Sequence, residues 1–264
     1  TRLRAMGRKR PRRRKGRKRM ELNQSNYYSP EADACYFSVS QFKDFMKCEA
    51  MALAKIRRQY TPPATRAMLI GSFVDAYFEG TLEAFMKDNP AVFTRKNELR
   101  SEFRKANEII GRIRADALFM QFMSGEKQKI LTFELFGVPW KMKMDSFVPD
   151  ICITDLKVTA NFRSLPLWRY DLQGAVYQAG VEANGLGHLP FYLAVATKEK
   201  VPNLDIFRVP DANLAIALEE IGERISHYAD VKRGFAQPSY CGECEYCRTI
   251  KQARIRNYNE LLEG

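Results

Sequence analysis

The chain has 264 residues, of which 45% are hydrophobic and 28% are charged. This composition is typical of a folded protein and excludes a largely disordered chain. No run of 18 or more apolar residues occurs, and no apolar segment follows the basic first residues. Neither a membrane span nor a secretory signal is therefore expected.

The net positive charge is concentrated at the beginning of the chain. There are 43 Lys and Arg residues against 31 Asp and Glu residues, and 12 of the basic residues, with no acidic one, lie in residues 1–19. So dense a run of like charge is expected to be disordered in isolation. It is either an arm that binds nucleic acid without regard to sequence or a non-native extension ahead of a start at Met20. We expect one domain over residues 20–264, whose charge is balanced.

Periodicity predicts the secondary structure. Helical spacing begins behind Ser40 as the N-cap and ends at the prolines 62–63; Asp211 is expected to cap a later helix that ends before Gly234. The other expected elements, in chain order, are helices over 65–79 and 98–123, strands over 130–136, 140–147 and 151–158 with a turn at 137–139, a helix over 167–184, strands over 190–197 and 204–209, and a cysteine-rich loop with a short final helix. This order predicts a layered α/β domain.

Two of the predicted strands carry a carboxylate and lysine pattern. Asp155 and Lys157 share one face of a strand, because side chains alternate along it, and a hairpin can bring Asp145 to the same patch. Two carboxylates at one point repel each other unless a cation lies between them, and oxygen ligands suit Mg²⁺ or Mn²⁺. A metal, a lysine and a water can hydrolyse a phosphodiester. The competing interpretation is a chance Asp-x-Lys with a structural role.

In this pattern the sequence resembles the PD-(D/E)xK nuclease superfamily, in its RecB/RecE-like branch of phage exonucleases (exodeoxyribonuclease VIII-like). Asp145 matches the core aspartate, and Asp155 and Lys157 match the (D/E)xK element. Gln173 and Tyr177 match the QxxxY motif, whose two side chains share a helix face. Asp75, four residues after a glycine, takes the place of a metal-binding histidine, which is a departure from the family. The resemblance covers roughly residues 27–250.

The resemblance implies the fold and the activity. The fold would be a restriction-endonuclease-like α/β core, in which helices flank a central mixed sheet, with N-terminal helices and a C-terminal cysteine-rich loop. The activity would be Mg²⁺-dependent exonuclease action on duplex DNA ends. Asp75, Asp145, Asp155 and the Leu156 carbonyl would hold the metal, and Lys157 would serve the attacking water. For Glu79 and Glu134 a supporting role is favoured. Lys141 and Lys143 are expected to contact phosphates.

Three late cysteines, Cys241, Cys244 and Cys247, have the spacing C-x₂-C-x₂-C. Thiols this close cannot all form disulfides, but they can face one metal centre. Cys48 is the best candidate for a fourth ligand, and Cys35 is the alternative. The arrangement resembles the 4Fe–4S staple of AddB-type helicase–nucleases and CRISPR-associated RecB-like nucleases, although the shorter last spacing keeps zinc open. Reduced thiols indicate a cytoplasmic protein.

Other functions remain open. The chain could be a non-catalytic DNA-binding module that keeps this fold and its metal staple, or a zinc-stabilised interaction protein. The family implies a bacterial host with a phage or prophage gene, and a strand-annealing recombinase as a partner. Whether several copies assemble is also open.

Overall fold

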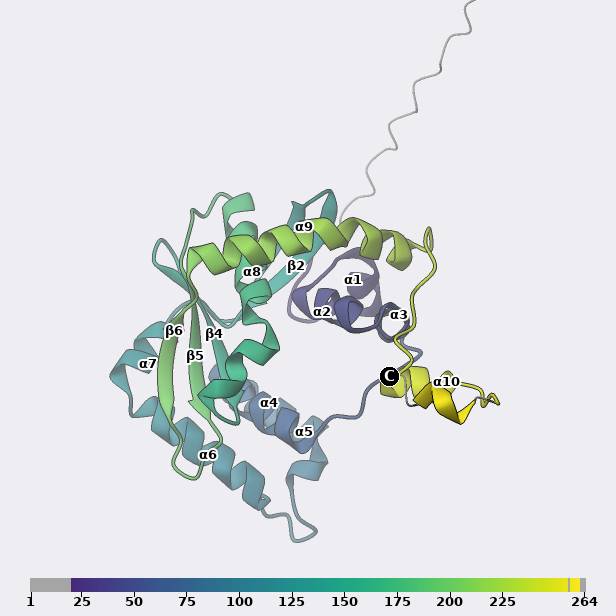
Figure 1. The fold of residues 1–264 in the computed structure, drawn as a ribbon. Coiled ribbons are helices and arrows are strands. Elements are labelled where there is room, and N and C mark those ends of the chain that lie inside the picture. The colour runs from purple at the N-terminus through teal and green to yellow at the C-terminus, as the bar shows by residue number, and fades with distance from the viewer. Residues whose placement is uncertain (1–19, 256, 262–264) are drawn as a thin grey trace, which may run out of the picture.

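The computed structural model describes residues 20–255 and 257–261 (Figure 1). The predicted tail over 1–19 lies outside the described residues. The helices are α1 Pro30–Cys35, α2 Val39–Lys47, α3 Glu49–Ile56, α4 Arg66–Glu79, α5 Leu82–Asp88, η1 Pro90–Val92, α6 Ser101–Arg114, α7 Ala117–Phe122, η2 Phe162–Trp168, α8 Tyr170–Ala183, α9 Asp211–Arg233, α10 Glu245–Ile250 and η3 Tyr258–Leu261. The strands are β1 Lys129–Leu135, β2 Val138–Met144, β3 Ser146–Val148, β4 Cys152–Thr159, β5 Phe191–Thr197 and β6 Leu204–Arg208.

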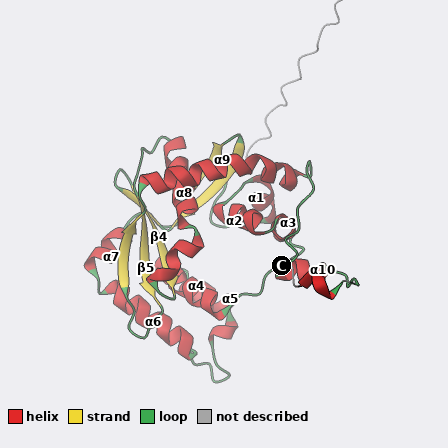
Figure 2. Ribbon diagram, viewed as in Figure 1, coloured by secondary structure: helices red, strands yellow, loops and turns green. Residues whose placement is uncertain are grey.

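A mixed four-stranded sheet forms the centre of the fold (Figure 2). Its strand order is β3-β4-β5-β6, in which β4 and β5 are parallel and the outer pairs are antiparallel. Strands β1 and β2 form a separate antiparallel hairpin. The predicted α/β architecture, with a mixed sheet, helices before it and a cysteine cluster after it, is confirmed.

Helices cover both faces of this sheet, and the alternation of side chains along β5 explains how. Phe191, Leu193 and Val195 pack into a large core cluster with residues of α8 and α9. Ala194 and Ala196 point to the opposite face and join a second cluster with residues of α4, α6 and α7. A strand buried on both faces is continuously apolar, as the sequence of β5 is.

The same alternation in β4 positions the charged residues. Ile153 belongs to the first core cluster, so Asp155 and Lys157 point to the side of the sheet that faces α8. Leu156 points to the other side and packs with the second cluster. Asp145 lies between β2 and β3, where the chain passes from the hairpin into the central sheet.

Two predicted helices are in fact interrupted. The first breaks at Cys48, whose backbone is extended (φ −169°, ψ 113°), and its N-cap is Ser38 rather than Ser40, because Ser38 accepts the bond from the Gln41 amide. The helix predicted over 98–123 divides into α6 and α7, since the side chain of Asp116 caps α7 through the Phe119 amide. In a continuously amphipathic segment, periodicity alone does not show where a side-chain cap divides one helix from the next.

Other boundaries also differ. The hairpin turn is at Phe136-Gly137, both with positive φ (52° and 71°), so that β2 begins at Val138, and the strand predicted over 140–147 is divided at Asp145. Asp211 is the first residue of α9 rather than its cap, whereas Gly234 does end that helix in the left-handed conformation. The helices α1 and α5 were not anticipated. No helix in the described part of the chain combines the length and the apolar character that crossing a membrane requires.

Candidate functional site

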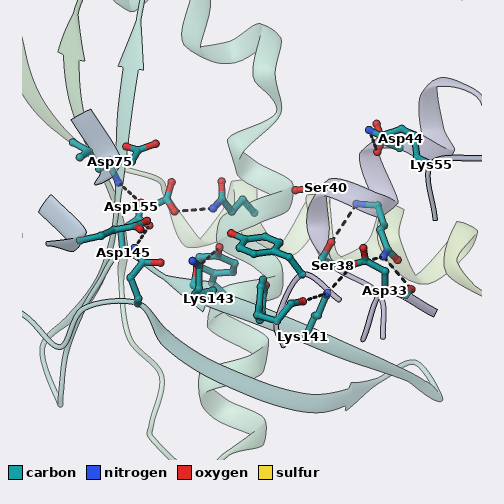
Figure 3. Close-up of a pocket in the computed structure, with 18 of the residues that line it drawn as sticks. Asp33, Ser38, Ser40, Asp44, Lys55, Asp75, Lys141, Lys143, Asp145 and Asp155 are labelled. Carbon is teal, nitrogen blue, oxygen red and sulfur yellow. Dashed lines mark hydrogen bonds and ion pairs between the residues drawn. The ribbon is translucent and has the colours of Figure 1, made fainter. Parts of the chain in front are cut away.

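A polar cavity of about 390 Å³ lies beside the central sheet (Figure 3). The residues that the sequence pattern singled out come together in its wall, although they come from α4, β4, α8 and the β2–β3 junction. They are Asp75, Asp145, Asp155, Leu156, Lys157, Gln173 and Tyr177. The candidate set is therefore spatially consistent; the role of each residue stays a prediction.

Asp145 is held by two neutral hydrogen-bond donors. Its Oδ2 accepts a bond of 2.9 Å from the main-chain amide of Leu156, and its Oδ1 accepts one of 3.1 Å from the side-chain amide of Gln128. Gln128 has a positive φ of 53° and a buried side chain. Sequence analysis missed Gln128, because nothing in its local pattern marks it.

Asp155 is almost fully buried, with 2% of its surface exposed. Its Oδ1 accepts a bond of 2.8 Å from Gln173, and its Oδ2 forms an ion pair with Lys157. Burial raises the pKa of Asp155 to about 7; Lys157 opposes this increase, and the charge of Asp145 adds to it. For Lys157, burial alone would lower the pKa, but the carboxylates of Asp155 and Asp145 outweigh burial and raise it. Lys157 is therefore an ammonium at neutral pH.

Asp75 on α4 completes a group of three carboxylates. Its Oδ1 is buried and has no hydrogen-bond partner among the described residues. Burial, followed by the charge of Asp145, raises the pKa of Asp75 well above its usual range. Figure 3 shows the side chains of Asp75, Asp145 and Asp155 gathered at one end of the cavity. A buried oxygen without a partner, beside two further carboxylates, fits a site for a hard cation.

Lys43 and Tyr170 lie next to Lys157 in the wall of a connected cavity, and sequence analysis identified neither of them. The centroid of the Tyr170 ring lies 5.1 Å from Lys157 Nζ and 5.2 Å from Lys43 Nζ. Lys43 also donates a bond of 2.7 Å to the carbonyl of Trp168. Burial, and then the charge of Lys157, lower the pKa of Lys43 to about 8. Lys43, Tyr170 and Lys157 come from three separate elements, α2, α8 and β4, so no local motif joins them.

The two members of the QxxxY motif have different surroundings. Gln173 contacts the candidate site directly through Asp155. Tyr177 lines the cavity, but its hydroxyl donates a bond of 2.8 Å to the main-chain carbonyl of Lys143, and burial raises its pKa well above the usual range. Tyr177 thus ties α8 to β2.

Lys141 and Lys143 both line the cavity, and their contact with phosphate stays a prediction, but the ammonium of Lys141 is already engaged. Lys141 is only 1% exposed and forms an ion pair of 2.7 Å with Asp33, because its side chain enters the protein between α1 and the hairpin. Lys143 remains at the cavity wall. Of the two accessory acids, Glu79 lines the cavity, whereas Glu134 is exposed and lies outside the cavity lining.

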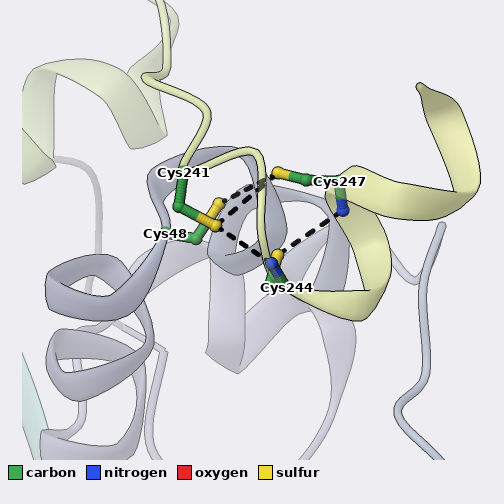
Figure 4. Close-up of side chains that lie close together, drawn as sticks. All are labelled: Cys48, Cys241, Cys244 and Cys247. Atoms are coloured by element: carbon green, nitrogen blue, oxygen red, sulfur yellow. Dashed lines mark hydrogen bonds between the residues drawn. The ribbon is translucent and has the colours of Figure 1, made fainter. Parts of the chain in front are cut away.

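A four-cysteine cluster joins the α2–α3 junction to the C-terminal segment (Figure 4). The sulfur atoms of Cys48, Cys241, Cys244 and Cys247 all lie within 4.8 Å of one another. Cys48 Sγ is 3.6 Å from Cys247 Sγ, and Cys241 Sγ is 3.9 Å from Cys247 Sγ. Cys35 is exposed and lies outside this group, so Cys48 is the fourth member.

Main-chain amides favour the thiolate form in part of this cluster. Hydrogen bonds from the main chain at Cys244 and Glu243 lower the pKa of Cys241 to about 6, whereas burial raises the pKa of Cys247 to about 12. The amide of Cys244 lies 3.3 Å from Cys241 Sγ, and that of Cys247 lies 3.5 Å from Cys244 Sγ. Amides that donate to thiolate sulfur are typical of a metal-binding knuckle.

Comparison with known proteins supplies the family. A family model described as a PDDEXK-like domain of unknown function (DUF3799) matches residues 38–250. A crystal structure from Eubacterium rectale, described as a "Putative exonuclease", is 41% identical, with a TM-score of 0.90 over 93% of this chain and 99% of that chain. The structure of SSO0001 is 13% identical, with a TM-score of 0.32 over 81% of this chain and 97% of that chain. No curated protein matches the chain.

Proposed function

Because the chain belongs to the PDDEXK-like family DUF3799, we propose that it is a metal-dependent deoxyribonuclease that acts as an exonuclease. The observation that carries this proposal is the convergence of three carboxylates on one cavity beside the protonated Lys157. In addition, the similar structure from Eubacterium rectale is described as a "Putative exonuclease".

Asp75, Asp145, Asp155 and the carbonyl of Leu156 would hold Mg²⁺ or Mn²⁺. The donor set is all oxygen, which suits these ions, and the buried Oδ1 of Asp75 lacks another partner within the described chain. Bound at this point, such a metal makes water more acidic and stabilises negative charge on a phosphate.

The remaining residues would position the reactants. Lys157, which is paired with Asp155, would donate hydrogen bonds to the attacking water or to the phosphate oxygens. Gln173 orients Asp155 through its 2.8 Å bond, and Tyr177 fixes β2 through the carbonyl of Lys143. Tyr177 would therefore act indirectly.

The substrate would be DNA, which the enzyme would degrade from the ends of a duplex. The setting would be phage or prophage recombination, with a strand-annealing recombinase as partner. Lys43, Lys143 and Lys157 line the connected cavities and would attract the phosphate backbone. The alternative is a DNA-binding module that keeps the fold without cutting. The intact set of Asp145, Asp155 and Lys157 favours the enzyme.

For the four cysteines the sulfur spacing favours a single zinc ion over a 4Fe–4S cluster. Zinc bound to sulfur at about 2.3 Å in a tetrahedron places the sulfurs about 3.8 Å apart. Two of the six separations, 3.6 Å and 3.9 Å, agree with that value, and all six are within 4.8 Å. A cubane of iron and sulfide is larger than one ion and requires wider spacing. The site would be structural, because it joins residues 199 positions apart.

Digestion of end-labelled linear duplex DNA tests the enzymatic proposal. We expect shortening that requires Mg²⁺, stops with EDTA and is lost in Lys157→Ala, while DNA binding persists. Lys198→Ala is the matched control, since Lys198 is a partly buried lysine outside the cavity. Cleavage that is unchanged in Lys157→Ala would contradict the catalytic assignment. An intact, metal-loaded protein that binds DNA but never cuts it would favour the binding module.

A further inference from the structure

Tyr28 is an exposed aromatic residue in the wall of the polar cavity. Its side chain is 66% exposed, yet it lines the same cavity as the three carboxylates. Isolated exposed aromatic residues are common on protein surfaces, so exposure alone indicates no function. Tyr28 differs from such residues because it lines the cavity and its backbone is held in place.

Hydrogen bonds hold the carbonyl of Tyr28 and the residue that follows it. Arg58 donates a bond of 2.8 Å to the Tyr28 carbonyl and also pairs with Asp33 at 2.7 Å. The next residue, Ser29, caps α1 by accepting a bond from the Ala32 amide. A ring on so fixed a backbone loses little conformational entropy when a ligand covers it.

The ring itself is oriented by its neighbours. It meets the buried ring of Tyr27 edge to face, with centroids 4.9 Å apart and planes at 88°. Lys143 Nζ lies 4.9 Å from the Tyr28 centroid. Lys143 is two residues before Asp145 on the chain, so an aromatic surface, a cation and the carboxylates follow one another along the cavity wall.

We propose that Tyr28 is a stacking platform for an unpaired nucleobase of the strand whose phosphate reaches the carboxylates, with Lys143 contacting the backbone phosphate nearby. This inference rests on the proposed nuclease function. An aromatic surface beside a cation is the combination that binds single-stranded nucleic acid without regard to sequence.

Fluorescence of 2-aminopurine tests the platform without cleavage. The base is placed at successive positions near the end of a single-stranded oligonucleotide, and binding is measured in EDTA. We expect quenching at one position with the wild-type protein and with Tyr28→Phe, which keeps the ring. Tyr28→Ala should lose that quenching and bind roughly 5- to 150-fold more weakly, the range that corresponds to loss of one stacked base. Phe235→Ala, which removes a 75% exposed ring outside the cavity, should behave as wild type.

An abasic nucleotide at the quenched position provides the second measurement. It should weaken wild-type binding as much as Tyr28→Ala does, and combining the two changes should add little. Additive effects, equal quenching in Tyr28→Ala, or loss of quenching in Tyr28→Phe would overturn the platform. A blunt duplex bound as tightly as an unpaired end, with the same dependence on Tyr28, would overturn the preference for an unpaired base.

These outcomes separate the platform from the nuclease. Quenching that depends on Tyr28 in a protein that never cuts DNA would preserve the platform and refute the enzymatic function. Normal Mg²⁺-dependent cleavage with no dependence of binding on Tyr28 would do the reverse.

Discussion

The carboxylate of Asp145 accepts a 2.9 Å hydrogen bond from the main-chain amide of Leu156. This bond fixes the junction between β2 and β3 against the central strand β4, directly beside Asp155. Because the donors to Asp145 are two neutral amides, they orient the carboxylate without neutralising it. Of the three carboxylates, Asp155 is the one that forms an ion pair with Lys157. The excess negative charge has measurable consequences.

Asp75→Asn should stabilise the metal-free protein at pH 8. The pKa of Asp75 is raised, so the folded state loses stability as pH rises above the ordinary carboxyl range, and a neutral amide removes that loss. We expect a gain on the order of 1 kcal/mol, or about 2–4 °C in Tm. Thermal unfolding with EDTA at pH 8 and pH 4 measures the gain, which should be smaller at pH 4.

The same substitution should weaken Mg²⁺ binding about tenfold or more and slow cleavage accordingly. Glu79→Gln is the matched control, since Glu79 also lines the cavity on α4 but lies one turn beyond Asp75. A destabilised Asp75→Asn protein that binds Mg²⁺ normally would show that Asp75 is a structural residue rather than a ligand.

Mg²⁺ binding should displace protons. The pKa of Asp155 is raised to about 7, chiefly by burial, and a cation requires the ionised carboxylate. We expect affinity to fall as pH decreases from 8 to 6, approaching tenfold per pH unit below 7 for each proton displaced. Calorimetry in two buffers with different ionisation enthalpies counts the protons released. Equal affinity at pH 6 and pH 8 would contradict this coupling.

The alternation of a strand explains why part of this site could be predicted. Asp155 and Lys157 are two residues apart, and Gln173 and Tyr177 are four apart on a helix, so each pair shares a face by local geometry alone. Trp140, Met142 and Met144 alternate along β2 in the same way, and all three are buried. Such periodicities depend only on residues that are close in sequence, so they can be recognised without knowledge of the tertiary fold.

Contacts between distant segments could not be read in this way. Gln128 and Lys43 reach the cavity through tertiary packing, and neither belongs to a motif. Lys141 alternates as if exposed, but Asp33, which is 108 residues away in sequence, lies opposite it and permits its burial. The cysteine cluster explains the break at Cys48, and its other members come from the end of the chain.

Cys48→Ser should release the metal of the cysteine cluster. Cys48 is the member that connects the α2–α3 junction to residues 241–247, and a metal bound only to the folded state adds its binding energy to stability. We expect one zinc per wild-type chain by metal analysis, little in Cys48→Ser, and a lower Tm in the variant. Cys35→Ser, an exposed cysteine outside the cluster, should match wild type.

Iron and acid-labile sulfide in place of zinc would overturn the zinc assignment but leave the ligand set intact. Full metal content in Cys48→Ser would instead show that three cysteines are sufficient. Addition of a strong chelator should lower the Tm of wild type towards that of Cys48→Ser and leave the variant unchanged.

Lys232 should make stability depend on pH in the opposite sense to Asp75. Its ammonium donates to the carbonyl of Tyr36 at 2.7 Å and to the side chain of Gln41 at 2.8 Å, and it lies 4.2 Å from the ring centroid of Phe37. Burial lowers its pKa to about 7, an effect that the charge of Asp33 partly opposes. From about pH 7 towards 10 the unfolded chain therefore holds the proton more tightly, and the fold gains stability as pH rises.

We expect Lys232→Met to remove this gain. The free energy of unfolding of wild type, measured in urea at pH 7.5 and pH 9, should rise by up to about 1.4 kcal/mol per pH unit more than that of Lys232→Met. Because both proteins share every other titrating group, their difference isolates Lys232. Parallel pH profiles would mean that the ammonium of Lys232 is as well accommodated in the fold as in water, and that its three contacts with α1–α2 offset its burial.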